Sequence, residues 1–331
     1  FQDWTTNDDT FDKVVSPTIA GYTADKSEIP AISGVKAKDQ DRVETVTYRK
    51  DAQKAVIRYV STNGNRVLTT DEVTGKSGEA IAYSTTSQIT EFKKQGYNLV
   101  SDEFTAGGAK VYDYDTARDQ VYTVTLSERV EPVNPDNPTP QPNTPVNPGQ
   151  PDSPRWPGTV ENLDNKESVS RTIHYVYEDG SKAKDDVVET LNFKRWSRIN
   201  LVTGQIFFQD WTTNDDTFDK VVSPTIAGYT ADKSEIPAIS GVKAKDQDRV
   251  ETVTYRKDAQ KAVIRYVSTN GNRVLTTDEV TGKSGEAIAY STTSQITEFK
   301  KQGYNLVSDE FTAGGAKVYD YDTARDQVYT V

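Results

Sequence analysis

The sequence predicts an α+β fold in which several small, strand-rich modules follow one another along the chain, and three observations predict it. Residues 1–124 recur without a substitution as residues 208–331, so the chain is a segment of a tandem array with a period of 207 residues. Short alternating apolar segments indicate half-buried strands, and one short amphipathic stretch per copy indicates a helix. Because this period is long for one small module, we expect a compound repeat.

The segment from residue 53 to residue 129 begins with a hairpin. Ala55–Val60 is an apolar, β-branched run, and Arg66–Val73 is its partner. Asn63-Gly64 lies between them, and this dipeptide is typical of a two-residue hairpin turn.

A short helix and two strands complete this segment. Thr85 can cap a helix whose apolar face carries Ile89 and Phe92, and Gly96 provides the left-handed residue that ends it. Two segments that alternate apolar and polar residues follow, 97–104 and 120–126. The order strand, strand, helix, strand, strand predicts a β-grasp (ubiquitin-like) module.

The other half of the repeat shows related signals. Val169–Tyr177 and Asp186–Lys194 read as strands on either side of a turn, and an insertion at Trp196–Trp211 holds a second hairpin turn at Thr203-Gly204. Residues 214–221 have helix-capping character but fit a loop equally well, because two turns are a marginal helix.

A proline-rich stretch separates the repeats. Ten of the fourteen prolines fall between Pro132 and Pro157, which predicts an extended polyproline spacer of about 3.1 Å per residue. We therefore expect an elongated, beads-on-a-string arrangement of five parts: an N-terminally truncated β-grasp module (1–52), a second module (53–129), the linker (130–166), a complete module with an inserted hairpin (167–259) and a further second module (260–331).

The composition argues against several classes of function. The net charge is −11 without a basic stripe, which argues against nucleic acid as a partner, and cysteine and methionine are both absent. No stretch has the length and apolar character of a membrane-spanning segment, so we expect no membrane insertion. The single histidine, His174, cannot serve two modules catalytically, and we expect no enzyme.

Several strings of the sequence together resemble the mucin-binding (MucBP, Mub-type) repeats of surface adhesins from lactic-acid bacteria. They are TIHYVYEDGSKAKDDVVETLNF, GQIFFQDWTTNDDTFDKVVSPTIAGYTADKSEIPA and VETVTYRK, which begin at Thr172, Gly204 and Val250. The resemblance covers essentially the whole repeat. It implies an extracellular, cell-wall-anchored bacterial protein whose repeats are pairs of β-grasp modules that bind mucin glycoproteins and, in a further reading, immunoglobulins. The chain shows neither a secretion signal nor a wall-anchoring motif, so anchoring would lie outside this segment.

Alternating tyrosines and aspartates are the first candidate ligand contacts, because aromatic faces stack on sugars and carboxylates accept bonds from sugar hydroxyls. The alternative is that the tyrosines, on one side of a strand, pack on a neighbouring strand. The motif occurs twice, as Tyr112, Asp113, Tyr114 and Asp115 and as Tyr319, Asp320, Tyr321 and Asp322.

Calcium is a possible cofactor and the sequence implies no other. Asp113, Asp115 and Asp119 could present oxygens to calcium, although they lack the glycine and glutamate of an EF-hand loop. The acidic cluster Asn7, Asp8, Asp9 and Asp12 invites the same reading, against a stronger helix-capping alternative.

Two more features are candidate contacts. Trp4 and Trp211 occupy the same repeat position and are either core anchors or exposed recognition residues, with core favoured. An edge strand for immunoglobulin binding is the second, because β-grasp binders such as protein L pair through such an edge. Its residues are Asp186, Val187, Val188, Glu189 and Thr190.

The repetition itself predicts how the chain works. Linked weak binders gain avidity from each added copy, whereas a second active site adds little. We therefore expect multivalent binding to mucin, with three alternatives: a purely structural stalk, an immunoglobulin-binding module and a glycosidase.

Overall fold

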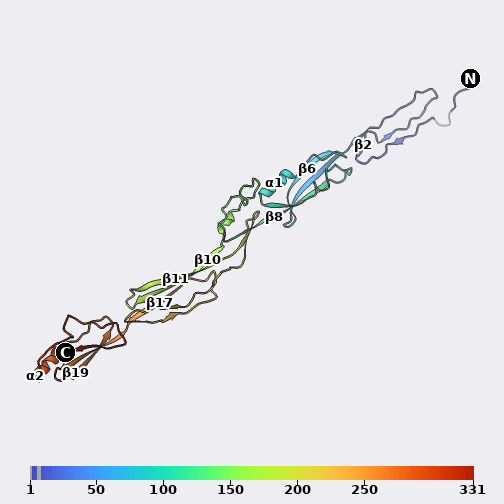
Figure 1. Cartoon of the computed structure of the whole chain (residues 1–331). Helices are drawn as coiled ribbons and strands as arrows, with labels where there is room; N and C mark the ends of the chain where they lie inside the picture. Colours follow the sequence, from blue (N-terminus) through green and yellow to red (C-terminus); the bar gives the residue numbers. More distant parts are fainter. Residues whose placement is uncertain (1, 6–8) are drawn as a thin grey trace. The chain divides into compact units, whose positions relative to one another are not determined.

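The computed structural model describes residues 2–5 and 9–331. Asn7 and Asp8, named above as possible calcium ligands, lie outside the described residues. The chain forms two compact units, residues 1–165 with 195–210 and residues 166–194 with 211–331. Strands predominate in both, as predicted, and few helices occur (Figure 1). In the described part of the chain, no helix combines the length and apolarity needed to cross a membrane.

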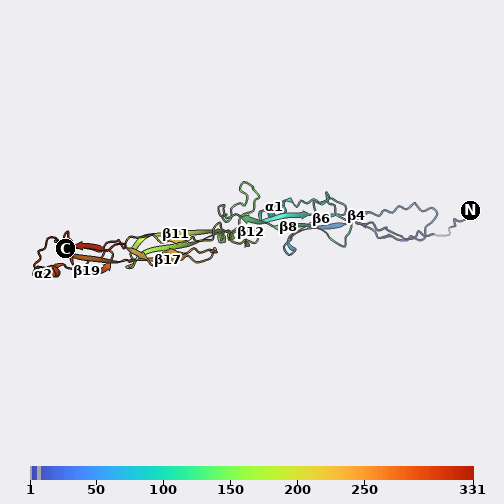
Figure 2. The same ribbon diagram turned by 60° about the horizontal axis from the view of Figure 1, so that its bottom comes forward.

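The first-copy module (residues 52–128) contains four strands and one helix in the predicted order. These are β5 (Ala52–Ser61), β6 (Arg66–Lys76), α1 (Thr86–Lys94), β7 (Tyr97–Asp102) and β8 (Gln120–Glu128). The sheet order is β6-β5-β8-β7, in which β5 and β8 run parallel and the other pairs run antiparallel. The helix lies against one face of this sheet (Figure 2).

The core of this module follows from the alternation in β5. Ala55, Ile57 and Tyr59 are completely buried on the face that α1 covers, and the helix contributes Ile89 and Phe92 to the same cluster. Burial of side chains of this size stabilises the fold by about 1.5–3 kcal/mol each. The predicted helix face is therefore confirmed.

The second-copy module (residues 259–331) repeats this sequence as β18 (Ala259–Ser268), β19 (Arg273–Lys283), α2 (Thr293–Lys301) and β20 (Gln327–Thr330), with the sheet order β19-β18-β20. Residues 304–309 form no strand, although their counterparts form β7. In the first copy β7 pairs with residues 124–128 of β8, of which the second-copy module repeats only Val124, as Val331.

A different module occupies residues 166–257. Its sheet has the order β11-β10-β17-β15, with β10 and β17 parallel. The strands are β10 (Lys166–Tyr177), β11 (Lys182–Lys194), β15 (Tyr229–Ala231) and β17 (Arg249–Lys257), and a small ladder joins β14 (Val221–Val222) to β16 (Glu235–Ile236). Residues 214–221 form no helix, so the loop alternative is correct there.

Residues 1–52 repeat the end of that module. Their strands are β1 (Val14–Val15), β2 (Tyr22–Ala24), β3 (Glu28–Ile29) and β4 (Tyr48–Lys50). Phe218 is 1 % exposed beneath Val169, Leu191 and Phe193, whereas its counterpart Phe11 is 56 % exposed. Val169, Leu191 and Phe193 precede Phe208, so they have no counterparts among residues 1–52.

The proline-rich segment is folded, so the predicted extended spacer is wrong. β9 (Val130–Val133) pairs with β12 (Ser197–Asn200), which pairs with β13 (Ile206–Phe208), and a 3-10 turn forms at Gly158–Asn162. Val133, Val160 and Ile199 form a buried cluster in this segment. The inserted hairpin predicted at Thr203-Gly204 is present, and it supplies the strand that orders the linker.

Candidate functional site

The predicted edge strand lies at the edge of its sheet. β11 pairs only with β10, except at Lys194, which exchanges backbone hydrogen bonds of 2.9 and 2.8 Å with Thr212. Strand alternation directs the backbone of Thr190 and Val188 to this same outer side, where no strand of the described chain pairs with them. Val188 is 63 % exposed.

A hollow of about 410 Å³ lies beside this edge. Leu191 and Phe193 contribute apolar surface, and polar groups surround them: Lys166, Glu167, Thr190, Asn192, Asn214 and Asp215. Leu191 and Phe193 are core residues, 6 % and 5 % exposed, so the accessible groups of the hollow are chiefly hydroxyl, amide, carboxylate and ammonium groups, which suit the hydroxyls of a sugar.

The loop that forms one wall of the hollow is fixed by local hydrogen bonds. The Thr213 hydroxyl donates to the Asn192 carbonyl oxygen at 2.8 Å and accepts the Asp215 N–H at 3.1 Å. The Asp215 carboxylate in turn accepts the Thr217 N–H at 2.9 Å. This loop is therefore positioned against β11 before any ligand arrives.

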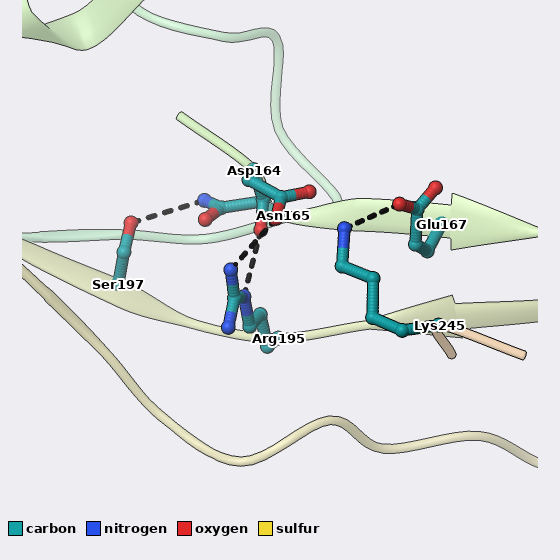
Figure 3. A network of polar contacts seen from close by, with 6 residues as sticks. All are labelled: Asp164, Asn165, Glu167, Arg195, Ser197 and Lys245. Atoms are coloured by element: carbon teal, nitrogen blue, oxygen red, sulfur yellow. Dashed lines mark hydrogen bonds and ion pairs between the residues drawn. The ribbon is translucent and has the colours of Figure 1, made fainter. Parts of the chain in front are cut away.

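Trp211 packs at the margin of the core. It lies against the cluster of Val169, Leu191 and Phe193, and the Lys245 ammonium lies 5.5 Å from its ring centroid. Lys245 also pairs with Glu167, and these two side chains point toward each other (Figure 3). Trp4, the counterpart of Trp211, is 80 % exposed. For the complete module, the core interpretation of this tryptophan agrees with the structure.

The contacts of Arg171 and its neighbours show which of the predicted edge residues face the interior of the module and which face away from it. Its side chain is completely buried, and its guanidinium contacts the Glu189 carboxylate at 2.5 Å and the Pro237 carbonyl oxygen at 3.1 Å. Glu189 therefore faces inward, as does Val187, which packs on the neighbouring core cluster. Asp186 faces the other way, with its carboxylate oxygen 2.9 Å from the His174 Nδ1 atom. The predicted edge pairing uses backbone groups, so the inward orientation of Val187 and Glu189 leaves it as a prediction.

The tyrosine-aspartate motif is not a strand, and only part of it is exposed. Tyr112 and Tyr319 are each 3 % exposed. Tyr112 lies over Gly75, where an added Cβ would come within 2.1 Å of the Tyr112 Cε2 atom. The prediction of ligand contact is therefore wrong for Tyr112 and Tyr319. Tyr114 and Tyr321 are 53 % exposed, and the Tyr114 ring lies over Gly21.

The aspartates of the motif shape its turns. Asp113 accepts the Asp115 N–H at 3.1 Å, Asp115 accepts the Ala117 N–H at 2.9 Å, and Asp119 pairs with Lys54 at 2.9 Å. Asp320 and Asp322 repeat these bonds. Among the described residues, no three acidic or histidine side chains are arranged to hold a metal ion. Asp113, Asp115 and Asp119 form no such cluster, and calcium binding by them stays a prediction.

A second polar cluster fixes the inserted hairpin to the end of the linker. Arg195 contacts the Asp164 carboxylate at 2.9 Å and the Asp164 carbonyl oxygen at 2.7 Å (Figure 3). Its guanidinium stacks 3.9 Å from the Phe208 ring centroid. Asn165 donates to the Ser197 hydroxyl at 3.1 Å. These contacts therefore fix both ends of the inserted hairpin, at Arg195 and at Phe208.

Sequence reasoning missed most of the hollow. Asn214 and Asp215 fall in the segment with helix-capping character, Lys166 is the last residue of the predicted linker, and Glu167 is the first residue of the predicted module. The Thr213-x-Asp215-x-Thr217 pattern, which is typical of hydrogen-bonded turns, was the available signal. It predicts a loop, but it does not show which strand the loop faces.

Comparisons with known proteins agree with these modules. The Muc B2-like domain matches residues 1–52 and 160–259, and the Mucin binding domain matches residues 53–128 and 260–331. The solved structure of Mub-RV is 26 % identical, with a TM-score of 0.50, over 62 % of this chain and 99 % of that one. A search of curated proteins finds no match.

Two further solved structures are similar in sequence. The type 2 repeat of the mucus binding protein MUB from Lactobacillus reuteri is 28 % identical over 62 % of this chain and 100 % of that one, with a TM-score of 0.42. The MucBP domain of the adhesion protein from Pediococcus pentosaceus is 37 % identical over 28 % of this chain and 98 % of that one, with a TM-score of 0.25. The chain belongs to the family of mucin-binding (MucBP, Mub-type) repeats.

Proposed function

We propose that this chain binds mucin glycoproteins as a repeat segment of a bacterial surface adhesin, and that the hollow beside β11 contacts the mucin glycans. Family membership supports the ligand class. The location rests on one observation, which is that amide, carboxylate and ammonium groups line one hollow beside a loop that is fixed by its own hydrogen bonds. Tyr114 and Tyr321, which are half-exposed, are secondary contacts in this proposal.

Binding is multivalent in this account. The hollow is shallow and open, so a single glycan contact is weak, whereas mucin presents many glycans on one polymer. Linking the copies raises the effective concentration for rebinding. The avidity of the linked copies can therefore exceed the affinity of one copy by a factor on the order of 10²–10⁴. The same mechanism needs no catalytic group, and we infer that the chain has no enzymatic turnover.

The repeat in this proposal is a pair of β-grasp modules. The order β6-β5-β8-β7 with a helix between β6 and β7 supports this description of the first-copy module. The proposed boundaries are residues 1–52, 53–129, 167–259 and 260–331, with residues 130–166 as the linking segment. We place the chain outside the bacterial cell, with wall anchoring through other parts of the protein.

Immunoglobulin binding is the second candidate function, and the open side of β11 favours it. Val188 and Thr190 present unpaired backbone groups that an antibody strand could extend by β-augmentation. Such pairing would use the same edge as the hollow. Antibody and mucin would then compete for the chain.

The hollow is tested by the double substitution Asn192→Ala/Asn214→Ala. Both side chains are exposed, so the fold should persist while sugar hydrogen bonds are lost. Binding to immobilised mucin is measured by surface plasmon resonance, and we expect a loss of roughly tenfold or more, as two polar contacts predict. Asn98→Ala, an exposed position on β7, is the matched control.

Three results would decide against this function. Unchanged mucin binding by the double variant would remove the hollow as the site. No mucin binding by the unaltered chain would favour a structural stalk. Binding that survives periodate oxidation of the glycans would show that the mucin polypeptide is the ligand.

A further inference from the structure

The sheet formed by the linker and the inserted hairpin has one covered face and one open face. Its strand order is β13-β12-β9. Ile199 of β12 is completely buried and shares a cluster with Val133 of β9. Because successive residues of a strand point to opposite faces, Trp196 and Arg198 point away from this cluster. Both side chains are exposed.

Strand pairing places residues of the neighbouring strands on the same open face. Arg198 lies opposite Phe207 of β13 and opposite Pro132 of β9. The Gln209 N–H donates to the Trp196 carbonyl oxygen at 2.9 Å, so the pairing continues one position beyond β12. Cβ atoms of directly opposite residues lie about 4.5–5.5 Å apart, and second neighbours along a strand lie about 7 Å apart. These five residues are called the open hairpin face, in which the arginine has a tryptophan and a phenylalanine as neighbours.

The aromatic side chains of the open hairpin face are accessible together. Trp196 is 41 % exposed and Phe207 is 46 % exposed. Within the described chain, the Trp196 indole N–H has no hydrogen-bond partner. Single exposed apolar residues are ordinary on a protein surface, whereas adjacent ones mark interaction sites. The fold of this sheet uses the opposite face, so it does not account for these two rings.

Arg198 differs from the other arginines of this sheet region. Arg129 pairs with Glu131, and Arg195 pairs with Asp164 at 2.9 Å. Among the residues that the structure describes, none forms a hydrogen bond or an ion pair with Arg198. The open hairpin face also holds no acidic residue, although the chain as a whole carries a net charge of −11. The guanidinium is therefore available to a carboxylate from outside the chain.

We propose that the open hairpin face binds a pyranose sugar that carries a carboxylate. The Arg198 guanidinium donates two parallel hydrogen bonds to the carboxylate, a geometry that suits its planar fork. The apolar C–H face of the sugar ring packs on the aromatic rings of Trp196 and Phe207. The inference rests on the proposed function, because mucin glycans supply the sugar.

This face and the hollow beside β11 differ in charge. The hollow is lined by the carboxylates of Glu167 and Asp215 and by the ammonium of Lys166. Two carboxylates beside one ammonium disfavour an acidic sugar. In this account the hollow takes neutral sugars, and the open hairpin face takes acidic ones.

The hairpin that carries the face is fixed before a ligand arrives. The Leu201 N–H donates to the Arg129 carbonyl oxygen at 2.9 Å. The Asn200 amide donates to the Glu128 carboxylate at 2.7 Å. A sugar that binds there has little chain to order, so less conformational entropy is lost on binding.

The indole N–H signals of the intact chain test the proposal. The chain has four tryptophans, and Trp196→Phe identifies the signal of Trp196 in a ¹⁵N–¹H spectrum. Methyl glucuronide and methyl glucoside have the same ring, but only the glucuronide carries a carboxylate. We expect the glucuronide to shift the Trp196 signal at millimolar concentration, and the glucoside to need a concentration roughly tenfold or more higher. Trp4 is 80 % exposed and lies outside the face, so its signal should not move.

Substitutions of the arginine show whether its fork is required. Arg198→Gln should weaken glucuronide binding roughly tenfold or more, because a charge-assisted hydrogen-bonded pair is lost. Arg198→Lys keeps the charge without the fork and should recover only part of the affinity. Arg58→Gln removes the same charge from an exposed position of β5 and should leave the affinity unchanged. The Trp156 ring packs against the covered face, so an unchanged Trp156 signal shows that the sheet is still folded.

Three results would overturn the proposal. They are a Trp196 signal that does not move, one that moves equally with the glucoside, and one that still moves to the same extent in Arg198→Gln. A shift that follows protein concentration without any sugar would assign the face to a second copy of the chain and would overturn it as well.

Mucin binding, measured separately by surface plasmon resonance, distinguishes this inference from the proposed function. If the chain binds mucin but the glucuronide does not shift the Trp196 signal, only this inference fails. If the glucuronide shifts that signal but the chain does not bind mucin, the sugar site stands and the proposed function fails.

Discussion

Arg171 provides the sharpest test of how the edge strand is held. Its guanidinium is completely buried and is neutralised by Glu189 of β11, whose side chain is 25 % exposed. It also reaches the carbonyl oxygens of Pro237 and Asp219. Arg171→Met keeps much of the apolar volume but leaves the carboxylate and both carbonyls without this partner. Loss of one member of a buried pair costs about 3–5 kcal/mol.

We expect Arg171→Met to fall near the lower end of that range, about 3 kcal/mol, because Glu189 retains some solvent. The double variant Arg171→Met/Glu189→Met removes the unpaired charge and should recover most of the loss. Native-state hydrogen exchange of peptides within residues 167–207 is the assay, because this sequence occurs once. Arg198→Met, on the exposed face of β12, is the control.

The reasoning fails if Arg171→Met lowers the free energy of unfolding by less than about 1 kcal/mol, which is the contribution of an exposed ion pair. It also fails if the double variant is as unstable as the single one. That result would show that the two carbonyl contacts, rather than Glu189, make the arginine necessary.

Other substitutions test the packing and the electrostatics. Tyr112→Ala should destabilise the first-copy module by about 3–5 kcal/mol in chemical denaturation, because it empties the buried space over Gly75. Tyr114→Ala removes a half-exposed ring and should lower the free energy of unfolding clearly less. Equal losses of stability would contradict the assignment of Tyr112 to the core. Hydrogen bonding by Ser170 lowers the pKa of Asp248, so the stability from this bond is present above the ordinary aspartate pKa and is lost as pH falls through the lowered value. Stability measured against pH should lose this acid-side decrease in Asp248→Asn, and an identical profile would exclude the bond as its source.

Local signals in the sequence predict much of the fold. The hairpin predicted at Asn63-Gly64 is present, although its loop has four residues, 62–65, with positive φ angles at Gly64 and Asn65. Thr203-Gly204 turns the inserted hairpin, because such turns depend on the backbone preferences of adjacent residues. The same is true of α1, whose apolar face is determined by helical periodicity. These elements need no information from distant parts of the chain.

The rest depends on contacts that sequence spacing does not reveal. Proline content predicts an extended linker, but β9 pairs with the distant strand β12, and Val133 and Ile199 share a buried cluster. Tyr112 looks exposed in a polar motif, and only the missing side chain of Gly75, on another strand, makes room to bury it.

The candidate site was predicted least well. The strand at Asp186–Lys194 was predicted from local strand and turn signals, and its edge position from the likeness to β-grasp immunoglobulin binders. The hollow was not, because it forms where the loop at Asn214 meets β11 across a gap in sequence. Arg171 was also missed, since nothing near it in the sequence distinguishes a buried arginine from an exposed one.

The most direct test of the central claim compares repeat number at constant repeat concentration. A single 207-residue unit, this chain and a longer concatemer are measured on native and periodate-treated mucin by surface plasmon resonance. We predict dissociation that slows steeply with repeat number on native mucin, weak binding by the single unit, and loss of binding after periodate. Equal affinity for all three proteins, or concatemers that do not bind mucin, would contradict multivalent glycan binding.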